Sequence, residues 1–218
     1  MTSADAAADS AVDSAVDRAS DRAFEEAADE ALTPAGERLL EAASTLFYRR
    51  GIRAVGVDLI AETAGTTKKT LYDRFGSKDE LVARYLRRRA RVWRAFLRAG
   101  MSDAPPGSGR PAAVFDVLAA WLREQDRGCA FVNAYAEIGG TDHPAEAEIR
   151  AEKQWMRRYL VDLVTEAGVV GPADAAERVG TELHLLYEGA TVLATAAGMS
   201  DAPTRARAAA LRALGGRP

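Results

Sequence analysis

The sequence has very few of the residues that bind metals or form disulfides. It contains one cysteine, Cys129, and two histidines, His143 and His184, among 218 residues. A single cysteine excludes an internal disulfide framework and fits a reducing compartment. Two scattered histidines with one cysteine are also too few for a typical metal site. We therefore expect a cytoplasmic protein with no metal and no other cofactor.

Long apolar runs are missing as well. No stretch reaches the roughly 18 apolar residues that a membrane-spanning helix needs. The first residues are acidic and rich in alanine, without the basic patch and apolar core of a signal peptide. We expect neither a membrane partner nor secretion. The chain is long enough to bury a sizeable core in one or two domains.

A net charge of −3 conceals three segments that differ in charge. Residues 1–33 carry nine acidic and two basic side chains, residues 34–100 carry fifteen basic and seven acidic ones, and residues 101–218 carry twelve basic and sixteen acidic ones. A concentrated basic segment is typical of proteins that bind a phosphate-bearing partner. The alternative for its densest run, Arg87 to Arg94, is a solvated helix face.

Residues 1–32 form an acidic, alanine-rich arm. An aspartate recurs at every fourth position from Asp5 to Asp21. In a helix these carboxylates would repel one another at i, i+4, whereas alanine favours the helix. We expect a mostly disordered or transiently helical segment. A functional alternative is that the arm mimics DNA and shields the basic segment.

The remaining sequence has helical periodicity and no strand alternation, so the predicted fold is all-α. A first helix should begin at Thr33-Pro34 and end at Gly51. A capping box, Ser77-Lys78-Asp79-Glu80, should start a long helix. A break rich in proline and glycine separates this helix from the rest of the chain. The other expected helices cover residues 57–64, 67–74, 78–99, 112–126, 129–138, 145–167, 173–197 and 204–214.

The stretch from Ala61 to Leu71 has the spacing of a helix-turn-helix. Such a motif needs a small residue where the two helices cross, a turn residue free to adopt a positive φ, and an apolar residue that faces back from the second helix. Ala61, Gly65 and Leu71 meet these needs in order. The outer face of the second helix then carries Thr67, Lys68, Lys69, Thr70 and Tyr72.

These side chains, together with Lys78, are of the types that contact DNA. Lysines neutralise phosphates, and hydroxyls hydrogen-bond to phosphate oxygens. Thr67 and Lys68 stand at the end of the second helix that would read base edges. Lys78 would add its charge to the free N–H groups at the start of the next helix. The alternative is an exposed basic helix that binds nothing.

Residues 36–82 resemble the DNA-binding domain of the TetR family of transcriptional regulators. The resemblance is carried by LFYRRGIRAVGVDLIAETAGTTKKTLYDRFGSKDELV. It implies an N-terminal three-helix helix-turn-helix domain, here 33–80, followed by a helical-bundle domain for ligand binding and dimerisation, here 81–218. It also implies a homodimer on inverted-repeat DNA, usually a repressor released by a small molecule. The DNA contacts of the family would fall on Thr67, Lys68, Lys69, Thr70, Tyr72 and Lys78.

Three positions depart from the pattern of the family. Gly56 stands where a serine or threonine usually starts the second helix, so that position offers no hydroxyl to a phosphate. Thr66 replaces a common valine, and Lys69 replaces a small residue within the recognition helix. The operator sequence can therefore not be inferred from any relative.

The second domain should hold an effector pocket, because helical bundles place ligand sites between facing helices. Residues 127–139, RGCAFVNAYAEIG, resemble a segment of one subgroup of TetR-type C-terminal domains. Packing in the core is the alternative for each aromatic candidate, and a satisfied core polar group is the alternative for Glu137 and His184. The candidate pocket residues are Trp93, Phe96, Phe115, Trp121, Asn133, Glu137, Tyr159 and His184.

The segment 173–197 is apolar on more than one face and rich in small residues. Gly180 and Gly189 would let another helix approach closely. The family resemblance places a homodimer interface on the last two helices, here 173–197 and 204–214. An apolar helix near the C-terminus does need a partner. Burial inside one subunit is the alternative.

The expected function is thus a ligand-responsive, homodimeric DNA-binding regulator that represses an adjacent operon until a small apolar or amphipathic molecule releases it. One alternative keeps the DNA binding but has no small-molecule ligand. Another is a helical enzyme in which Cys129 and His143 or His184 supply a nucleophile and a base. No acidic pair, glycine-rich phosphate loop or metal-ligand spacing supports the enzyme.

Overall fold

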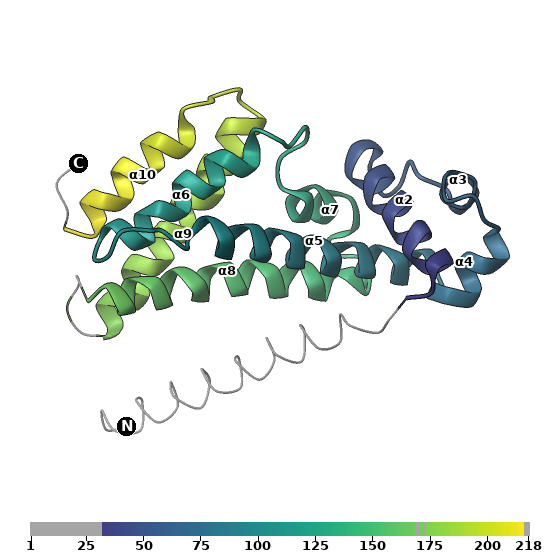
Figure 1. Ribbon diagram of the computed structural model, residues 1–218, viewed down its shortest axis with the longest axis horizontal. Helices are drawn as coiled ribbons and strands as arrows, with labels where there is room; N and C mark the ends of the chain where they lie inside the picture. Colours follow the sequence, from purple (N-terminus) through teal and green to yellow (C-terminus); the bar gives the residue numbers. More distant parts are fainter. Residues whose placement is uncertain (1–31, 169–170, 172, 216–218) are drawn as a thin grey trace, which may run out of the picture. The chain divides into compact units, whose positions relative to one another are not determined.

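The computed structural model describes residues 32–168, 171 and 173–215, and the regular elements in these residues are all α-helices (Figure 1). The chain divides into two compact units, Met1–Pro34 and Ala35–Pro218. The predicted acidic arm lies outside the described residues except for its last position. The described residues of the second unit have the predicted all-α fold.

Three helices come first in the described chain, and the last two of them form the predicted helix-turn-helix. These helices are α2 (Pro34–Arg50), α3 (Val57–Thr63) and α4 (Lys68–Phe75). Gly65 in the turn between α3 and α4 has a φ of +60°, a backbone conformation that disfavours other residues. Leu71 of α4 and Ile60 of α3 are fully buried, as the spacing predicted for Leu71.

Helix α5 (Lys78–Gly100) follows directly and runs on into the second group of helices (Figure 1). Its first turn is capped as the sequence indicated, because the Ser77 side chain accepts a hydrogen bond from the Glu80 N–H at 3.0 Å. Helix α5 contacts α4, α6, α7 and α8. Helix α5 therefore links the predicted DNA-binding helices to the other helices of the unit.

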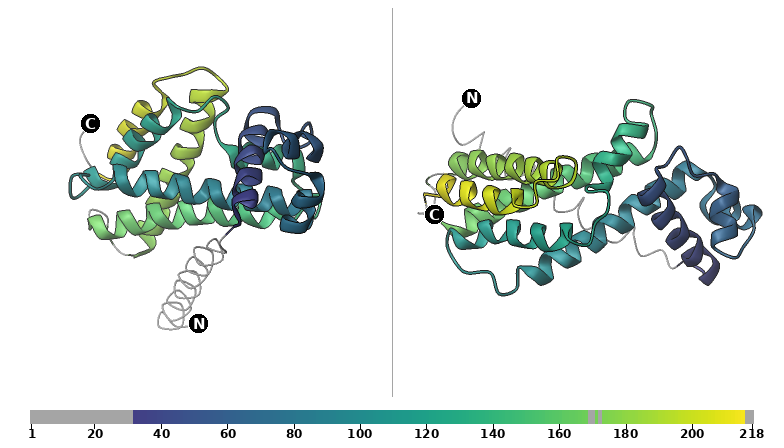
Figure 2. Two further views of the ribbon diagram at one scale, coloured as in Figure 1. Left: turned by 45° about the vertical axis from the view of Figure 1, so that its right-hand side comes forward. Right: turned by 90° about the horizontal axis from the view of Figure 1, so that it is seen from above.

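Five further helices complete the unit: α6 (Gly109–Leu122), α7 (Ala130–Ile138), α8 (Ala145–Ala167), α9 (Ala173–Thr195) and α10 (Ala202–Ala213). Helices α8 and α9 pack along each other, and α10 packs on α6 and α9 (Figure 2). Their shared core includes Leu97, Phe115, Leu118, Leu160 and Leu183, all essentially inaccessible to solvent.

Three details differ from the helices expected from sequence, and the first is that α6 ends at Leu122 and not at residue 126. Helix α6 begins three residues early, because Pro111 fits within a first helical turn, where no N–H is needed. Gly180 receives α8 of its own chain, since an added Cβ would lie 2.6 Å from the Val161 backbone. That glycine therefore serves close packing within the subunit. Among the described residues, no helix is long and apolar enough to span a bilayer.

Candidate nucleic-acid interface and effector pocket

Helix α4 presents most of the predicted DNA-binding side chains to solvent. Thr67, Lys68 and Lys69 are exposed, and Tyr72 is 44% exposed. Thr70 is half-buried, and its backbone N–H and its hydroxyl both bond to the Thr67 hydroxyl, at 3.1 and 2.9 Å. Thr67 is the N-cap of the helix, so its hydroxyl has a structural task that the sequence did not reveal.

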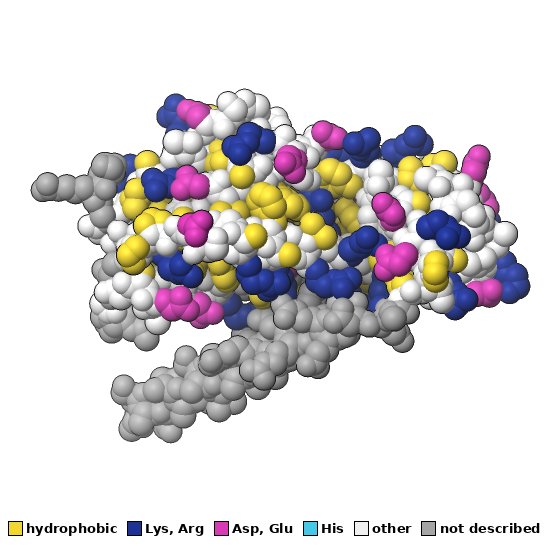
Figure 3. All heavy atoms as spheres, in the orientation of Figure 1, with side chains coloured by type: hydrophobic (Ala, Val, Ile, Leu, Met, Phe, Trp, Pro, Cys, Tyr) yellow, Lys and Arg dark blue, Asp and Glu magenta, His cyan; other side chains and the backbone are white. Residues whose placement is uncertain are grey.

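Both lysines on this face have a carboxylate partner in the free protein. Lys68 Nζ lies 3.2 Å from Asp58 Oδ2 on α3, and Lys69 Nζ lies 2.6 Å from Asp73 Oδ2 one turn along α4. Acidic side chains are interspersed among the basic ones around α2 to α4 (Figure 3). Exposed ion pairs of this kind contribute little free energy, so a phosphate or a base edge can replace the aspartate.

Lys78 is more constrained than the other predicted DNA contacts. It is half-buried, its Nζ donates to the Ile52 carbonyl at 2.7 Å, and it lies 5.9 Å from the centre of the Phe47 ring. Burial lowers the pKa of Lys78, although the charges of Asp79 and Glu137 oppose that shift. An ammonium has three N–H donors, so two remain for a phosphate.

Replacing Lys78 by alanine should weaken binding to every DNA sequence about equally. The loss of one phosphate contact per subunit lowers the slope of log affinity against log salt by about 0.9 per contact. Tyr72→Phe is the matched uncharged change, and it should lower affinity without altering that slope. Fluorescence anisotropy at several salt concentrations measures both. A Lys78→Ala protein with the affinity and slope of the wild type would refute the phosphate contact.

The turn after α2 is held by a side chain from α7. The Glu137 carboxylate accepts hydrogen bonds from the Ile52 and Arg53 N–H groups at 3.0 and 2.7 Å. Gly51 makes this approach feasible, since a Cβ there would lie 2.8 Å from a Glu137 oxygen and its φ is +89°. Glu137, predicted as an anchor for the effector, therefore belongs to α7 and binds the turn after α2 instead.

The loop between α6 and α7, residues 123–129, holds the end of α2 in a second place. The Tyr48 hydroxyl donates to the Gly128 carbonyl at 3.0 Å and accepts from the Arg127 N–H at 3.1 Å. The Arg127 guanidinium donates to the Arg49 carbonyl, one of the last carbonyls of α2, at 3.1 Å. Asn133 braces the loop by donating to the Arg127 carbonyl at 2.7 Å.

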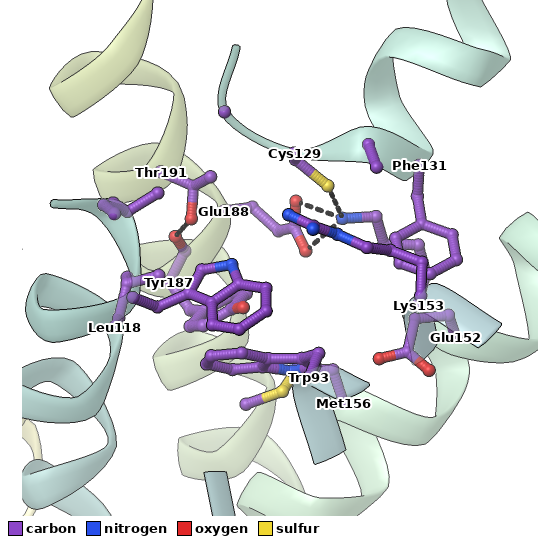
Figure 4. Close-up of a pocket in the computed structure, with 15 residues that line it drawn as sticks. Trp93, Leu118, Cys129, Phe131, Glu152, Lys153, Met156, Tyr187, Glu188 and Thr191 are labelled. Atoms are coloured by element: carbon purple, nitrogen blue, oxygen red, sulfur yellow. Dashed lines mark hydrogen bonds and ion pairs between the residues drawn. The ribbon is translucent and has the colours of Figure 1, made fainter. Parts of the chain in front are cut away.

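A pocket lies directly behind this loop, between α5, α6, α7, α8 and α9 (Figure 4). Its volume is about 40 Å³. The lining combines large apolar side chains with charged ones, and Gly128 and Cys129 of the loop form part of it. The lining includes Arg89, Trp93, Leu118, Trp121, Phe131, Glu152, Lys153, Met156, Tyr187 and Glu188.

An ion pair crosses the pocket between α8 and α9. Lys153 Nζ donates to both Glu188 oxygens at 2.7 Å and lies 3.4 Å from the Cys129 sulfur (Figure 4). Burial raises the pKa of Glu188, but the His184 hydrogen bond and the Lys153 charge outweigh it and hold this pKa below its usual range. Burial lowers the pKa of Lys153, but Cys129 and Glu188 outweigh it and raise this pKa. The pair is therefore fully charged at neutral pH.

The predicted effector residues fall in several places. Trp93 and Trp121 line the pocket, with ring centres 5.3 Å apart. His184 lies 3.3 Å from Glu188 at the edge of the pocket, and Asn133 lines a neighbouring hollow. The structure does not bring the remaining candidates into the lining: Phe115 is fully buried in the core, Phe96 and Tyr159 pack against the core, and Glu137 holds the α2–α3 turn.

Four charged residues of the pocket lining are absent from the sequence prediction: Arg89, Glu152, Lys153 and Glu188. Arg89 belongs to the basic run for which a solvated face was one reading. Lys153 and Glu188 stand 35 residues apart, and no local pattern joins them. The only feature of the sequence that could have identified these residues is their position as charged side chains on helix faces that are otherwise apolar. Among the described residues, no group of side chains could hold a metal ion.

Comparison with known proteins identifies the helix-turn-helix region and the C-terminal helices separately. The sequence model described as "Bacterial regulatory proteins, tetR family" matches residues 39–85. The model described as "Tetracyclin repressor-like, C-terminal domain" matches residues 107–210. The first match contains the helix-turn-helix, and the second contains α6 to α9 and most of α10.

The relatives are regulators. The transcriptional activator FasR of Mycolicibacterium smegmatis is 30% identical over 134 residues, and the match covers 60% of this chain but only 58% of FasR. The transcriptional repressor KstR2 of Mycobacterium tuberculosis is 47% identical over 49 residues, which are 22% of this chain and 24% of KstR2.

Solved structures of other proteins match this chain over most of their length. SCO4454, a TetR-family transcriptional regulator from Streptomyces coelicolor, is 30% identical with a TM-score of 0.68, and the match covers 84% of this chain and 93% of SCO4454. The helical enzyme considered from sequence is thereby set aside. The chain belongs to the TetR family and is a DNA-binding transcriptional regulator.

Proposed function

We propose that this protein is a homodimeric repressor that binds an inverted-repeat operator and is released from it by a small molecule in the pocket behind the α6–α7 loop. One observation carries the proposal. Gly128 lines the pocket, and its carbonyl accepts the hydrogen bond of Tyr48 at the end of α2. A ligand that shifts this loop acts directly on the DNA-binding helices, so its affinity can differ between two arrangements of them.

Exposed apolar side chains support the dimer. Leu185, Val192 and Leu193 lie on α9 and are 69%, 44% and 43% exposed, and Met199 just beyond is 40% exposed. Their spacing of seven and eight residues places the first three on one face of the helix. An apolar face of this kind favours a self-complementary contact with a second copy. The interface would therefore involve α9, as the sequence predicted, with α10 beside it.

The small volume of the pocket favours one alternative, a regulator without a small-molecule effector. At about 40 Å³ the pocket has no room for a drug-sized molecule unless side chains move. Under this alternative the residues of the pocket serve only to join α5, α8 and α9. A titration with small molecules of different chemistry separates the two functions, because only a regulator with an effector binds one of them in the pocket.

Selection of binding sites from random duplex DNA, read at two salt concentrations, tests the DNA-binding part of the proposal. We expect a palindrome with half-sites about 34–36 Å apart, one turn of the duplex, and a steep loss of affinity with salt. Enrichment of a single half-site would contradict the dimer. Operators are part of the bacterial chromosome, so the proposal also places the protein in the cytoplasm.

A further inference from the structure

We infer that the effector is a small monocarboxylate with an apolar body, and that Arg89 binds its carboxylate group. This inference rests on the proposed function, because it names the chemical class of the effector of the same pocket. It depends on the charge balance of the lining, on the geometry of one guanidinium and on the nature of the surrounding walls.

Arg89 differs from the other charged residues that line the pocket. Lys153 is paired with Glu188 at 2.7 Å, and Glu152 is paired with Arg94 at 2.8 Å. The Arg89 guanidinium instead donates to the neutral side chain of Gln125. Within the described part of the chain, no carboxylate lies within ion-pair distance of Arg89. The lining holds two basic and two acidic side chains, but Glu152 pairs with Arg94, which lies outside the lining, so among the described residues Arg89 is left without an acidic partner.

The surroundings of Arg89 leave donors available for a carboxylate. The guanidinium carbon lies 4.7 Å from the centre of the Trp121 ring and 4.8 Å from that of the Tyr48 ring. The rings fix the position of the group, while its N–H donors lie along its edges. A guanidinium has five such donors in a fork that matches a carboxylate, and Gln125 accepts from only one nitrogen.

The acids of the pocket favour a single negative charge. Glu152 and Glu188 both line it, and they repel a ligand that carries two negative charges. A positively charged ligand would be repelled by Arg89 and Lys153. A neutral molecule would leave the Arg89 fork without a new partner. A monocarboxylate is the charge type that gains a bidentate hydrogen bond with the least repulsion.

The walls of the pocket require an apolar body on the ligand. Four aromatic side chains line the pocket: Trp93, Trp121, Phe131 and Tyr187. A second hollow of about 330 Å³ shares Phe131 and Lys153 with the pocket and opens towards Tyr135 and Ile149. The two cavities are therefore neighbours, and a ligand body longer than the pocket would have to displace Phe131 to reach the second hollow while its carboxylate stays at Arg89.

Binding of a ligand at Arg89 would also change a contact with α2, one of the DNA-binding helices. The guanidinium touches the ring of Tyr48, whose hydroxyl joins α2 to the α6–α7 loop at Gly128 and Arg127. A carboxylate that draws the guanidinium into the pocket weakens this contact, because cation–π attraction depends on the distance to the ring. Ligand and Tyr48 thus compete for the same side chain.

Calorimetric titration of the full-length protein tests the inference with two pairs of probes. Octanoate is compared with 1-octanol, and 3-phenylpropanoate with 3-phenyl-1-propanol. In the wild type we expect at least one acid to bind about tenfold more tightly than its alcohol, the usual value of a charged hydrogen bond. Arg89→Gln should abolish the difference. Arg123→Gln, which removes an exposed arginine outside the pocket, should keep it.

Several outcomes would overturn the inference. These are an alcohol that binds as tightly as its acid, an acid preference that survives in Arg89→Gln, and an absence of acid binding at millimolar concentration. If Arg89→Gln fails to fold, Arg89→Lys replaces it. Lysine keeps the charge but loses the planar fork, so a preference undiminished in that variant would equally count against bidentate recognition.

Repeating the titrations on protein bound to its selected operator separates this inference from the proposed function. If an acid binds through Arg89 but leaves operator affinity unchanged, the ligand class stands and release by the effector is wrong. If a neutral molecule releases wild-type and Arg89→Gln protein equally well, the proposed function stands and the carboxylate inference is wrong.

Discussion

Replacing Glu152 by glutamine should lower the free energy of unfolding by about 3–5 kcal/mol, because the change leaves a buried guanidinium without its hydrogen-bonded carboxylate. The side chains of Arg94 and Glu152 are only 2% and 5% exposed. Arg94 Nε and Nη2 donate to one Glu152 oxygen at 3.0 and 2.8 Å, and Trp155 lies 4.3 Å from the guanidinium carbon. Removing the negative charge therefore affects the contact between α5 and α8 at a buried position.

Thermal and urea unfolding followed by circular dichroism measure this effect. At roughly 2–4 °C per kcal/mol for a domain of this size, the melting temperature should fall by about 6–20 °C. Glu148→Gln is the matched control, because Glu148 lies one turn away on α8 and pairs with Arg87, which is 25% exposed. Water can reach Arg87, so the control should lose about 1–2 kcal/mol.

A double variant distinguishes the cost of an unpaired charge from the net value of the pair. Arg94→Met with Glu152→Leu removes both charges and keeps similar volumes, and it should recover most of the stability lost in Glu152→Gln. If Glu152→Gln alone stays within about 1 kcal/mol of the wild type, water or another group must already compensate Arg94, and the argument from burial fails.

The parts of the fold that depend on neighbouring residues could be predicted from the sequence. Ala61, Gly65 and Leu71 lie within ten residues, and their sizes and backbone preferences define the turn between α3 and α4. The cap at Ser77 is equally local, since its partner is three residues away. Short-range geometry of this kind leaves a readable pattern, because each residue type is required by the backbone beside it.

The composition of the pocket could not be predicted, because its contacts are long-range. Tyr48 and Gly128 are 80 residues apart, and Arg94 and Glu152 are 58 residues apart. Helical periodicity shows which face of a helix is buried but not what that face meets. Phe115 and Trp93 have similar patterns, yet the first fills the core and the second lines the pocket. Only the packing of five helices separates these two roles.

Replacing Lys68 by alanine should reduce the preference for operator over random DNA by about tenfold to a hundredfold per half-site, the usual value of a specific base contact. A dimer reads two half-sites, so the combined loss is about a hundredfold to ten-thousandfold. Lys68 is the first residue of α4, at the end of a recognition helix that meets base edges. Competition between labelled operator and random duplex measures the preference.

Lys69→Ala is the control for Lys68→Ala, because Lys69 is the next residue of α4. Lys69 has the same charge and is likewise paired with an aspartate, Asp73, so replacing it removes an equivalent ion pair. Lys69→Ala should lower affinity for all DNA and reduce the salt slope by about 1.8 per dimer, with the preference unchanged. If the two variants behave alike, Lys68 contacts phosphate as well, and the base reading must come from other side chains of α4. If only Lys68→Ala relaxes the preference, its pair with Asp58 becomes the contact that the operator replaces.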